Sequence, residues 1–372
     1  MQYPAQPYYS CLPPHLYTAR LVADPMKVLT VVGARPQFIK ASVVSPALRK
    51  KCTEVLVHTG QHYDFRMSEI FFKGLSIPAP DYNLGCGSGS HGAQTGKILS
   101  RLEKVMIDEK PDFVLTYGDT NSTLAGALCA AKLHIRTGHV EAGLRSFNRT
   151  MPEEINRVMA DHVSDLLFCP TQRSVAQLAK EGVTSGVHLV GDVMYDSALR
   201  YGRGTGALKA LGLTPKKYIL LTVHRPSNAD VRENLSAILS SLKGRETVFP
   251  AHPRTVKMMR RFKLSAPRGV KIIAPQGYPE MLQLVRGASH VLTDSGGLQK
   301  EAYFLGTPCV TLRSETEWLE TVEAGWNVLT GADWRKISKA LEAPKPTGKR
   351  GREFGDGKAA DKIVKLVCRA EK

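Results

Sequence analysis

The sequence predicts an α/β protein with two domains, each built around a parallel β-sheet. Three observations support this fold class. From Met26 onwards, short runs rich in Val, Ile and Leu alternate with segments that have helical periodicity. The short runs are apolar on both faces, as strands are when helices cover both sides of a parallel sheet. They number about ten, which is more than one mononucleotide-binding sheet usually holds.

Strands are predicted where β-branched and aromatic residues form short runs between polar or glycine-rich segments. In chain order these runs are Lys27–Val32, Val55–His58, Phe113–Tyr117, Val187–Val190, Tyr218–Val223, Thr247–Phe249, Val270–Ile273, His290–Thr293 and Pro308–Leu312. Helices are predicted between them where apolar residues recur every three or four positions. The clearest are Ser122–Leu133, Glu153–Val163, Arg232–Leu242, Tyr278–Val285, Leu298–Leu305 and Lys358–Val367.

Changes in composition suggest the domain boundaries. Residues 1–25 are rich in Pro and Tyr and are expected to form a tail before the patterned sequence begins. The first domain is expected to span residues 26–195, because the segment around residues 195–215 is rich in Gly and Lys and lacks a buried strand. The second domain is then expected at residues 196–345. Residues 346–372 contain another linker and a final amphipathic helix.

The composition excludes several classes of protein. The chain has 372 residues, of which 42% are hydrophobic, so wholesale disorder is excluded. No run approaches the ~20 apolar residues of a membrane span. The 7 cysteines are scattered, which argues against a disulfide framework or a zinc ribbon. The N-terminus lacks the pattern of a signal peptide, so a cytoplasmic location is expected.

The positive charge has two interpretations. There are 51 Lys and Arg residues against 34 Asp and Glu residues, a net charge of +17. Such an excess suits either a nucleic-acid partner or a phosphorylated substrate bound by a generally basic protein. Composition does not choose between them. The basic clusters at residues 260–263 and 345–352 lack the architecture of a nucleic-acid-binding module and are expected to be solvated surface.

Polar residues follow the predicted strands, where parallel sheets bind their ligands. Arg35 follows the first strand through the turn at Gly33, with Lys40 one turn further along. An Arg can bind a phosphate with two hydrogen bonds, although a solvated Arg beside a tight turn is an equal alternative. Asp119 follows another strand and, taken alone, is more often a helix cap. Glu141 lies between apolar residues at a strand end, where a carboxylate is costly without a partner or a function.

Two further candidates gain weight from these neighbours. Glu153 follows Pro152 at a helix start, where acidic residues are ordinary. Three carboxylates near one cleft would nevertheless suit proton transfer. His224 ends the first strand of the second domain and could titrate near neutrality or donate to a phosphate. Arg225 beside it favours a functional interpretation.

The segment from Asp294 to Glu301 is the most informative. Ser295, Gly296 and Gly297 join a strand to a helix, so backbone N–H groups and the positive end of the helix dipole face an anion. Glu301 lies on the first turns of that helix, where it could accept hydrogen bonds from ribose hydroxyls. The pattern favours the phosphate of a nucleotide.

Taken together, ten motifs resemble the non-hydrolysing UDP-N-acetylglucosamine 2-epimerase family. They occur in this order: GARPQFIK, HTGQHYD, YGDTNST, GHVEAGLRS, MPEEINR, GDVMYD, TVHRPSN, QGYPEML, TDSGGLQKEA and TEWLETVEAGWN. The resemblance implies two Rossmann-like domains facing a central cleft, the GT-B arrangement, with the last helix packed on the first domain. It also implies a cytosolic homodimer that acts on a UDP-sugar without a metal or NAD. No nucleic acid or membrane partner is expected.

The resemblance also implies roles for individual residues. The family converts UDP-N-acetylglucosamine to UDP-N-acetylmannosamine by anti elimination of UDP and its re-addition. The residues that match the family's catalytic group are Asp119, Glu141, Glu153 and His224. Those expected to bind substrate are Arg35, Lys40, Arg145, Ser295, Gly296, Gly297 and Glu301. The carboxylates would act at carbon 2, and the identity of the base stays open. The basic residues and the glycine turn would stabilise the departing UDP, and Glu301 would hold the ribose.

Departures from the family pattern leave alternatives. Trp318 stands where many members have Arg, close to the nucleotide-sugar site. The variant resembles branches that act on UDP-2,3-diacetamido-2,3-dideoxyglucuronate as well as UDP-N-acetylglucosamine enzymes, so both substrates remain open. A GT-B glycosyltransferase and a hydrolysing relative are further alternatives. Residues 61–64 keep only part of the pattern that binds a second, activating UDP-N-acetylglucosamine, so that regulation is not predicted.

Overall fold

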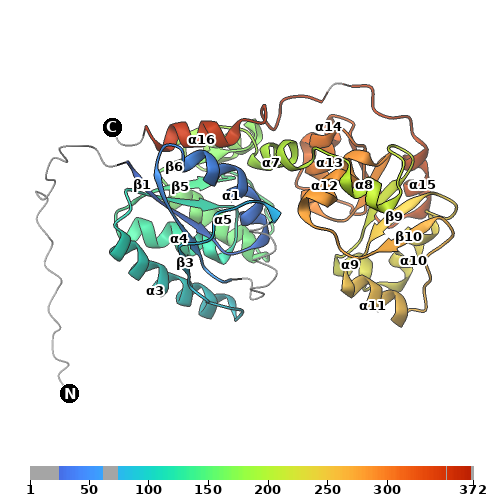
Figure 1. The fold of residues 1–372 in the computed structure, drawn as a ribbon, viewed down its shortest axis with the longest axis horizontal. Coiled ribbons are helices and arrows are strands. Elements are labelled where there is room, and N and C mark those ends of the chain that lie inside the picture. The colour runs from blue at the N-terminus through green and yellow to red at the C-terminus, as the bar shows by residue number, and fades with distance from the viewer. Residues whose placement is uncertain (1–24, 62–73, 349, 370–372) are drawn as a thin grey trace, which may run out of the picture.

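Two parallel sheets organise the computed structural model, which describes residues 25–61, 74–348 and 350–369 (Figure 1). Each sheet lies between helices, and every strand pairing recorded is parallel. The prediction of a two-domain α/β protein is therefore confirmed. Among the residues described, no helix is both long and apolar enough to span a bilayer.

The first sheet has the strand order β3-β2-β1-β4-β5-β6-β7. Its strands are β1 (Lys27–Val32), β2 (Thr53–His58), β3 (Tyr82–Asn83), β4 (Phe113–Tyr117), β5 (Arg136–Val140), β6 (Leu166–Cys169) and β7 (Val187–Leu189). Its helices are α1 (Arg35–Leu48), α3 (His91–Glu109), α4 (Asn121–Lys132), α5 (Pro152–Val163) and α6 (Gln172–Lys180). The order reverses between β1 and β4, so the carboxyl ends of these two strands border the crevice where such sheets bind ligands.

The second sheet has the strand order β10-β9-β8-β11-β12-β13. Its strands are β8 (Ile219–Thr222), β9 (Thr247–Pro250), β10 (Val270–Ile273), β11 (His290–Thr293), β12 (Cys309–Thr311) and β13 (Asn327–Leu329). Its helices are α8 (Gly206–Leu211), α9 (Pro226–Ala229), α10 (Arg232–Ser240), α11 (Pro253–Arg261), α12 (Tyr278–Gly287), α13 (Gly296–Leu305), α14 (Leu319–Glu323) and α15 (Trp334–Glu342). The order reverses between β8 and β11, which gives the second domain an equivalent crevice.

Four strands lie outside the predicted list: β3, β5, β6 and β13. The sequence of β5 is RTGHV, whose Arg, Gly and His give no apolar run, although all but Arg136 are buried. Strands β3 and β13 have 2 and 3 residues, too few for a pattern to be recognised. These segments pair with the sheet because the adjacent strands have backbone N–H and C=O groups that need hydrogen-bond partners.

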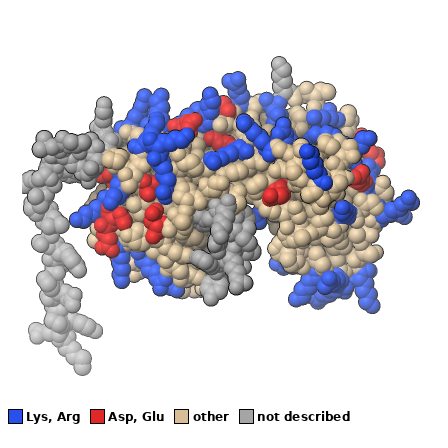
Figure 2. Space-filling view, viewed as in Figure 1, with Lys and Arg blue, Asp and Glu red and all other residues tan. Residues whose placement is uncertain are grey.

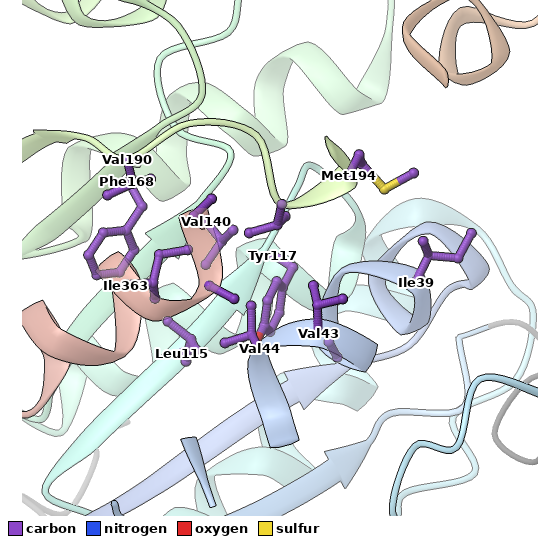
Figure 3. Close-up of a cluster of buried hydrophobic side chains, with 14 of the residues drawn as sticks. Ile39, Val43, Val44, Leu115, Tyr117, Val140, Phe168, Val190, Met194 and Ile363 are labelled. Carbon is purple, nitrogen blue, oxygen red and sulfur yellow. The ribbon is translucent and has the colours of Figure 1, made fainter. Parts of the chain in front are cut away.

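The final helix, α16 (Ala359–Val367), lies on the first domain and not on the second (Figure 1). Its apolar face belongs to the same buried cluster as Val44, Leu115 and Phe168, and Figure 3 shows Ile363 among them. Helix α7 (Val193–Tyr201) also packs on this domain and continues across the expected boundary at residue 195. The chain therefore passes from the first domain to the second and back again.

Candidate active site

The turn after β1 is built by close packing. A Cβ atom on Gly33 would lie 2.1 Å from Thr59 Oγ1 and 2.2 Å from Ser122 Oγ, so only glycine fits there. Gln37 accepts a hydrogen bond from Gly33 N at 2.8 Å and donates to Tyr117 O at 2.9 Å, which ties this turn to the end of β4. Arg35 is the first residue of α1 and is exposed at this edge. Although part of its side chain is exposed, desolvation by the surrounding protein lowers its pKa, and the charge of Glu301 in the second domain opposes that effect.

Glu141 is the centre of a group of charges that includes both domains. It follows β5 with a φ of +75°, a left-handed conformation that non-glycine residues rarely adopt outside constrained sites. Its carboxylate forms an ion pair with Lys40 of α1 and lies 3.4 Å from Lys300 Nζ of α13. Burial lowers the pKa of Lys40 to about 8, and the charge of Asp119 opposes this. Sequence reasoning thus placed Glu141 and Lys40 in one site, and the structure brings them into contact.

Asp119 and Glu153 are linked through α5. The Asp119 carboxylate accepts a hydrogen bond from Arg157 Nη2 at 2.5 Å, and its side chain remains 38% exposed. Arg157 also donates to the backbone oxygen of Glu153 at 3.3 Å. Glu153 is exposed, whereas its neighbour Glu154 is buried and accepts hydrogen bonds from Ser146 and Phe147. The two adjacent acids therefore differ: Glu154 holds a loop, and Glu153 is available to a ligand.

His224 lies just after β8 in the second domain, whereas the acids described above lie in the first domain. Its Nδ1 is 3.2 Å from Oδ1 of Asp294, which is fully buried and also accepts from the backbone N of Arg225 at 3.0 Å. Burial lowers the pKa of His224, with Asp294 opposing and Arg225 adding to the decrease. Because Asp294 holds Nδ1, the ring presents Nε2 to a ligand, and the side chain is 43% exposed.

The turn into α13 leaves room for an anion. Ser295 caps the helix through its hydroxyl, which accepts from Leu298 N at 3.4 Å. A Cβ atom on Gly297 would meet no described atom within 4 Å, so protein packing does not require glycine there. The open space and the free N–H groups at the helix start fit a phosphate.

Glu301 lies one turn further along α13 and is almost completely buried. Burial raises the pKa of its carboxyl to about 7, and the hydroxyl of Tyr278 and the charges of Lys300 and Arg35 counteract that shift. Glu301, which was predicted to hold the ribose, is therefore a titratable group beside the glycine turn.

Arg145 is held within the protein. Its guanidinium donates to Asp161 at 2.6 Å and to both carboxylate oxygens of Glu181 at 2.7 and 2.8 Å. Asp161 in turn lies 2.7 Å from Nδ1 of the fully buried His139. The structure thus gives Arg145 a role in supporting the loop after Glu141 and not as a free ligand for phosphate.

A cavity of about 560 Å³ lies between the domains beside that loop. The first domain contributes residues of the loop and of α6, and the second contributes Arg225, Arg313 and the segment around Trp318. Arg313 is already paired with Glu317 through two contacts of 2.9 and 3.0 Å. The predicted substrate-determining residue Trp318 is therefore part of a wall shared by both domains.

Comparison with known proteins agrees with this geometry. The sequence model of the family described as UDP-N-acetylglucosamine 2-epimerase matches residues 47–368. The chain belongs to this family. It is 50% identical to a UDP-N-acetylglucosamine 2-epimerase homolog of Methanococcus maripaludis, with 92% of this chain and 99% of that protein covered. It is 48% identical to the UDP-2,3-diacetamido-2,3-dideoxy-D-glucuronate 2-epimerase of Pseudomonas aeruginosa, with 92% and 100% covered.

The fold of this epimerase family member also matches solved structures. The Methanocaldococcus jannaschii UDP-GlcNAc 2-epimerase, crystallised with UDP-GlcNAc and UDP, has a TM-score of 0.81 and 43% identity, covering 92% of this chain and 100% of that one. The predicted GT-B arrangement is confirmed by such neighbours. The chain is therefore an isomerase, an epimerase of nucleotide sugars.

Sequence reasoning missed several side chains that lie against the candidate site residues. Lys300 was treated only as part of the helix after the glycine turn, and Asp192 only as part of a motif. Arg157, which pairs with Asp119, also lay inside a quoted motif without a role. Their partners come from distant parts of the chain, so local patterns carried no signal for them. Residues 61–64, which keep part of the family's activator-binding pattern, lie outside the described residues from residue 62 onwards.

Proposed function

We propose that this protein interconverts UDP-N-acetylglucosamine and UDP-N-acetylmannosamine. The observation that carries the proposal is the division of chemistry between two facing crevices. Carboxylates follow the strands of the first domain, and an open helix N-terminus with His224 follows those of the second. Elimination of UDP requires both, since one side must accept a proton and the other must receive a departing diphosphate.

In the first half-reaction a carboxylate takes the proton from carbon 2 of the sugar. The electron pair of that C–H bond forms the double bond between carbons 1 and 2, and the bond from carbon 1 to the phosphate oxygen breaks. UDP departs with that electron pair. We assign the stabilisation of its growing charge to His224, Arg35 and the turn formed by Ser295, Gly296 and Gly297, a role that the open helix start and the basic side chains support.

In the second half-reaction UDP adds back to carbon 1, and carbon 2 receives a proton on the opposite face. This requires an acid on one face and a base on the other. Asp119, Glu141 and Glu153 provide three candidates with different surroundings: Glu141 between two lysines, Asp119 beside an arginine, and Glu153 exposed. We assign this pair of roles to the three acids as a group.

A second candidate substrate is UDP-2,3-diacetamido-2,3-dideoxyglucuronate. An epimerase named for that substrate is 48% identical to this chain, compared with 44% and 43% for two UDP-N-acetylglucosamine 2-epimerases and 50% for a UDP-N-acetylglucosamine 2-epimerase homolog. The wall containing Trp318 also contains Arg225 and Arg313, which could face an added sugar carboxylate.

One experiment separates these substrates. Each UDP-sugar is incubated with the protein in deuterated water and followed by NMR. Epimerisation must place deuterium at carbon 2 and yield the epimer, whereas hydrolysis would release free sugar and UDP. Absence of deuterium with both substrates would reject the proposal. A glycosyltransferase would instead require an acceptor for any turnover.

We also propose that the protein acts as a cytoplasmic homodimer that requires no metal or NAD, as expected from the family resemblance. Light scattering coupled to size-exclusion chromatography measures the mass directly, and a mass of one chain at micromolar concentration would reject the dimer.

On the face drawn in Figure 2, Lys and Arg side chains are spread over both domains. This distribution supports a substrate-binding role for only a few of the basic residues.

A further inference from the structure

Lys300 is a buried cation whose partners come from both domains. It extends from α13 of the second domain, and its side chain is only 3% exposed. Its Nζ lies 2.6 Å from Asp192 Oδ2 and 3.4 Å from Glu141 Oε1. Both of these carboxylates precede α8, the first helix of the second domain. The ring of Trp318 lies 3.8 Å from the same atom. One ammonium group thus joins the glycine-turn helix to the carboxylate at the centre of the acid group.

Burial of a charge is costly unless partners compensate it. The first domain supplies both carboxylates that compensate Lys300, whereas the second domain supplies the aromatic face. Separation of the domains would take Glu141 away from the ammonium, whereas Asp192 caps α7, which packs against α13 as well as against α1. The contact between Lys300 and Glu141 is therefore made only when the two crevices are held together.

Lys40 shows by comparison why the contact between Lys300 and Glu141 depends on both domains. It also pairs with Glu141, but it lies on α1 of the same domain as Glu141. That contact is available whatever the position of the second domain. The contact with Lys300 depends on the position of the second domain, and it links Glu141 to the helix whose N-terminus faces the diphosphate.

We propose that Lys300 is a positioning residue of this epimerase, which fixes the Glu141 carboxylate in the assembled cleft while Trp318 holds the ammonium in place. This inference rests on the function proposed above. The backbone of Glu141 is constrained at a positive φ, and its carboxylate is held by Lys40 and Lys300. Displacement of a reacting group by about 1 Å can cost a hundredfold in rate.

The test compares steady-state kinetics of Lys300→Met, Lys300→Arg and Trp318→Leu with the unaltered protein. Lys300→Met should lower kcat about tenfold to a hundredfold while KM changes less than threefold. Lys300→Arg keeps the charge and should recover most of the lost kcat. Trp318→Leu removes the aromatic face and should lower kcat about threefold to tenfold. The matched control is Lys271→Met, an exposed lysine of the same domain, which should leave kcat unchanged.

A second variant guards against a folding defect. Lys300→Met alone would leave the buried Asp192 without its cation, so Lys300→Met combined with Asp192→Asn removes both charges. Asn can still cap α7, where Asp192 accepts from Met194 N at 2.8 Å. This double variant should fold, bind UDP normally in calorimetry and show the same loss of kcat.

The outcomes are distinguishable. A double variant with kcat within twofold of the unaltered protein overturns the positioning role. A rise in KM or a loss of UDP affinity with unchanged kcat also overturns it, since Lys300 would then act in binding. If the unaltered protein turns over neither UDP-sugar, the proposed function itself fails.

Discussion

Substitution of Gly297 by alanine separates the anion-binding role of the glycine turn from its structural role. The new methyl group would meet no described protein atom within 4 Å, and the residue is helical with ordinary φ. Alanine is preferred over glycine in a helix, so the free energy of unfolding should rise by about 0.4–1 kcal/mol. For a chain of this size that corresponds to an increase in Tm of roughly 0.5–1.3 °C.

The same methyl group would occupy the space into which a phosphate must come to reach the N–H groups at the start of α13. We therefore expect UDP affinity to fall at least tenfold, which is about 1.4 kcal/mol. Isothermal titration calorimetry with UDP measures this directly, and differential scanning calorimetry measures the stability.

The matched control is Gly96→Ala. Gly96 is an exposed glycine in α3 whose added Cβ would also meet nothing within 4 Å. It should show a similar gain in stability with unchanged UDP affinity. Gly297→Ala with UDP affinity within twofold of the unaltered protein would refute the assignment of this turn to the phosphate.

Three further predictions concern other parts of the molecule. Asp119→Asn or Glu141→Gln should leave UDP affinity within about threefold in calorimetry but abolish deuterium incorporation at carbon 2, because each keeps the shape and removes the charge; loss of UDP binding would instead make these acids structural. The pKa of Glu301 is raised to about 7 in the folded protein, so its contribution to stability is lost as pH rises from about 4.5 through 7. As its carboxylate forms over that range, UDP affinity should increase, and Glu301→Gln should retain only the pH dependence of UDP itself; an unchanged profile would contradict contact with the ribose. Finally, Cys52 Sγ and Cys368 Sγ lie 2.9 Å apart, so diamide, which removes two electrons and two protons from a pair of thiols, should link them. Peptide mapping should find that disulfide and Cys368→Ser should abolish it, whereas a link that never forms would contradict the docking of α16.

The fold was predictable where residues repeat a local pattern, and not where distant partners decide. The run Phe113–Tyr117 is apolar except for Thr116, is buried throughout and was predicted with the bounds that the structure has. Strand β5 was missed because its His139 is made compatible with burial by Asp161 and by the backbone oxygen of Gly118, to which Nε2 lies at 2.6 Å. A strand that depends on such partners has no apolar signature of its own.

The same distinction applies to the site. The glycine turn after β11 carries its chemistry within consecutive residues, so it could be recognised as a candidate phosphate site from the sequence. Arg145 carries the same charge as Arg35, and only its neighbours Asp161 and Glu181 show that it is already paired. Lys300 presents the reverse case, because its ordinary position in an amphipathic helix gives no hint of the two carboxylates that meet it across the cleft.

The return of the chain to the first domain has a consequence for biosynthesis. Helix α16 contributes Ile363, Val364 and Val367 to the buried cluster that contains Val44, Leu115 and Phe168 of the first domain and that continues into the second domain. These residues follow the second domain in the chain, so the first domain cannot complete this part of its core until the second domain has been translated. The second domain has its own core and can fold before that point. The N-terminal domain of this protein therefore cannot be finished before the second domain is synthesised, unlike the usual order of cotranslational folding.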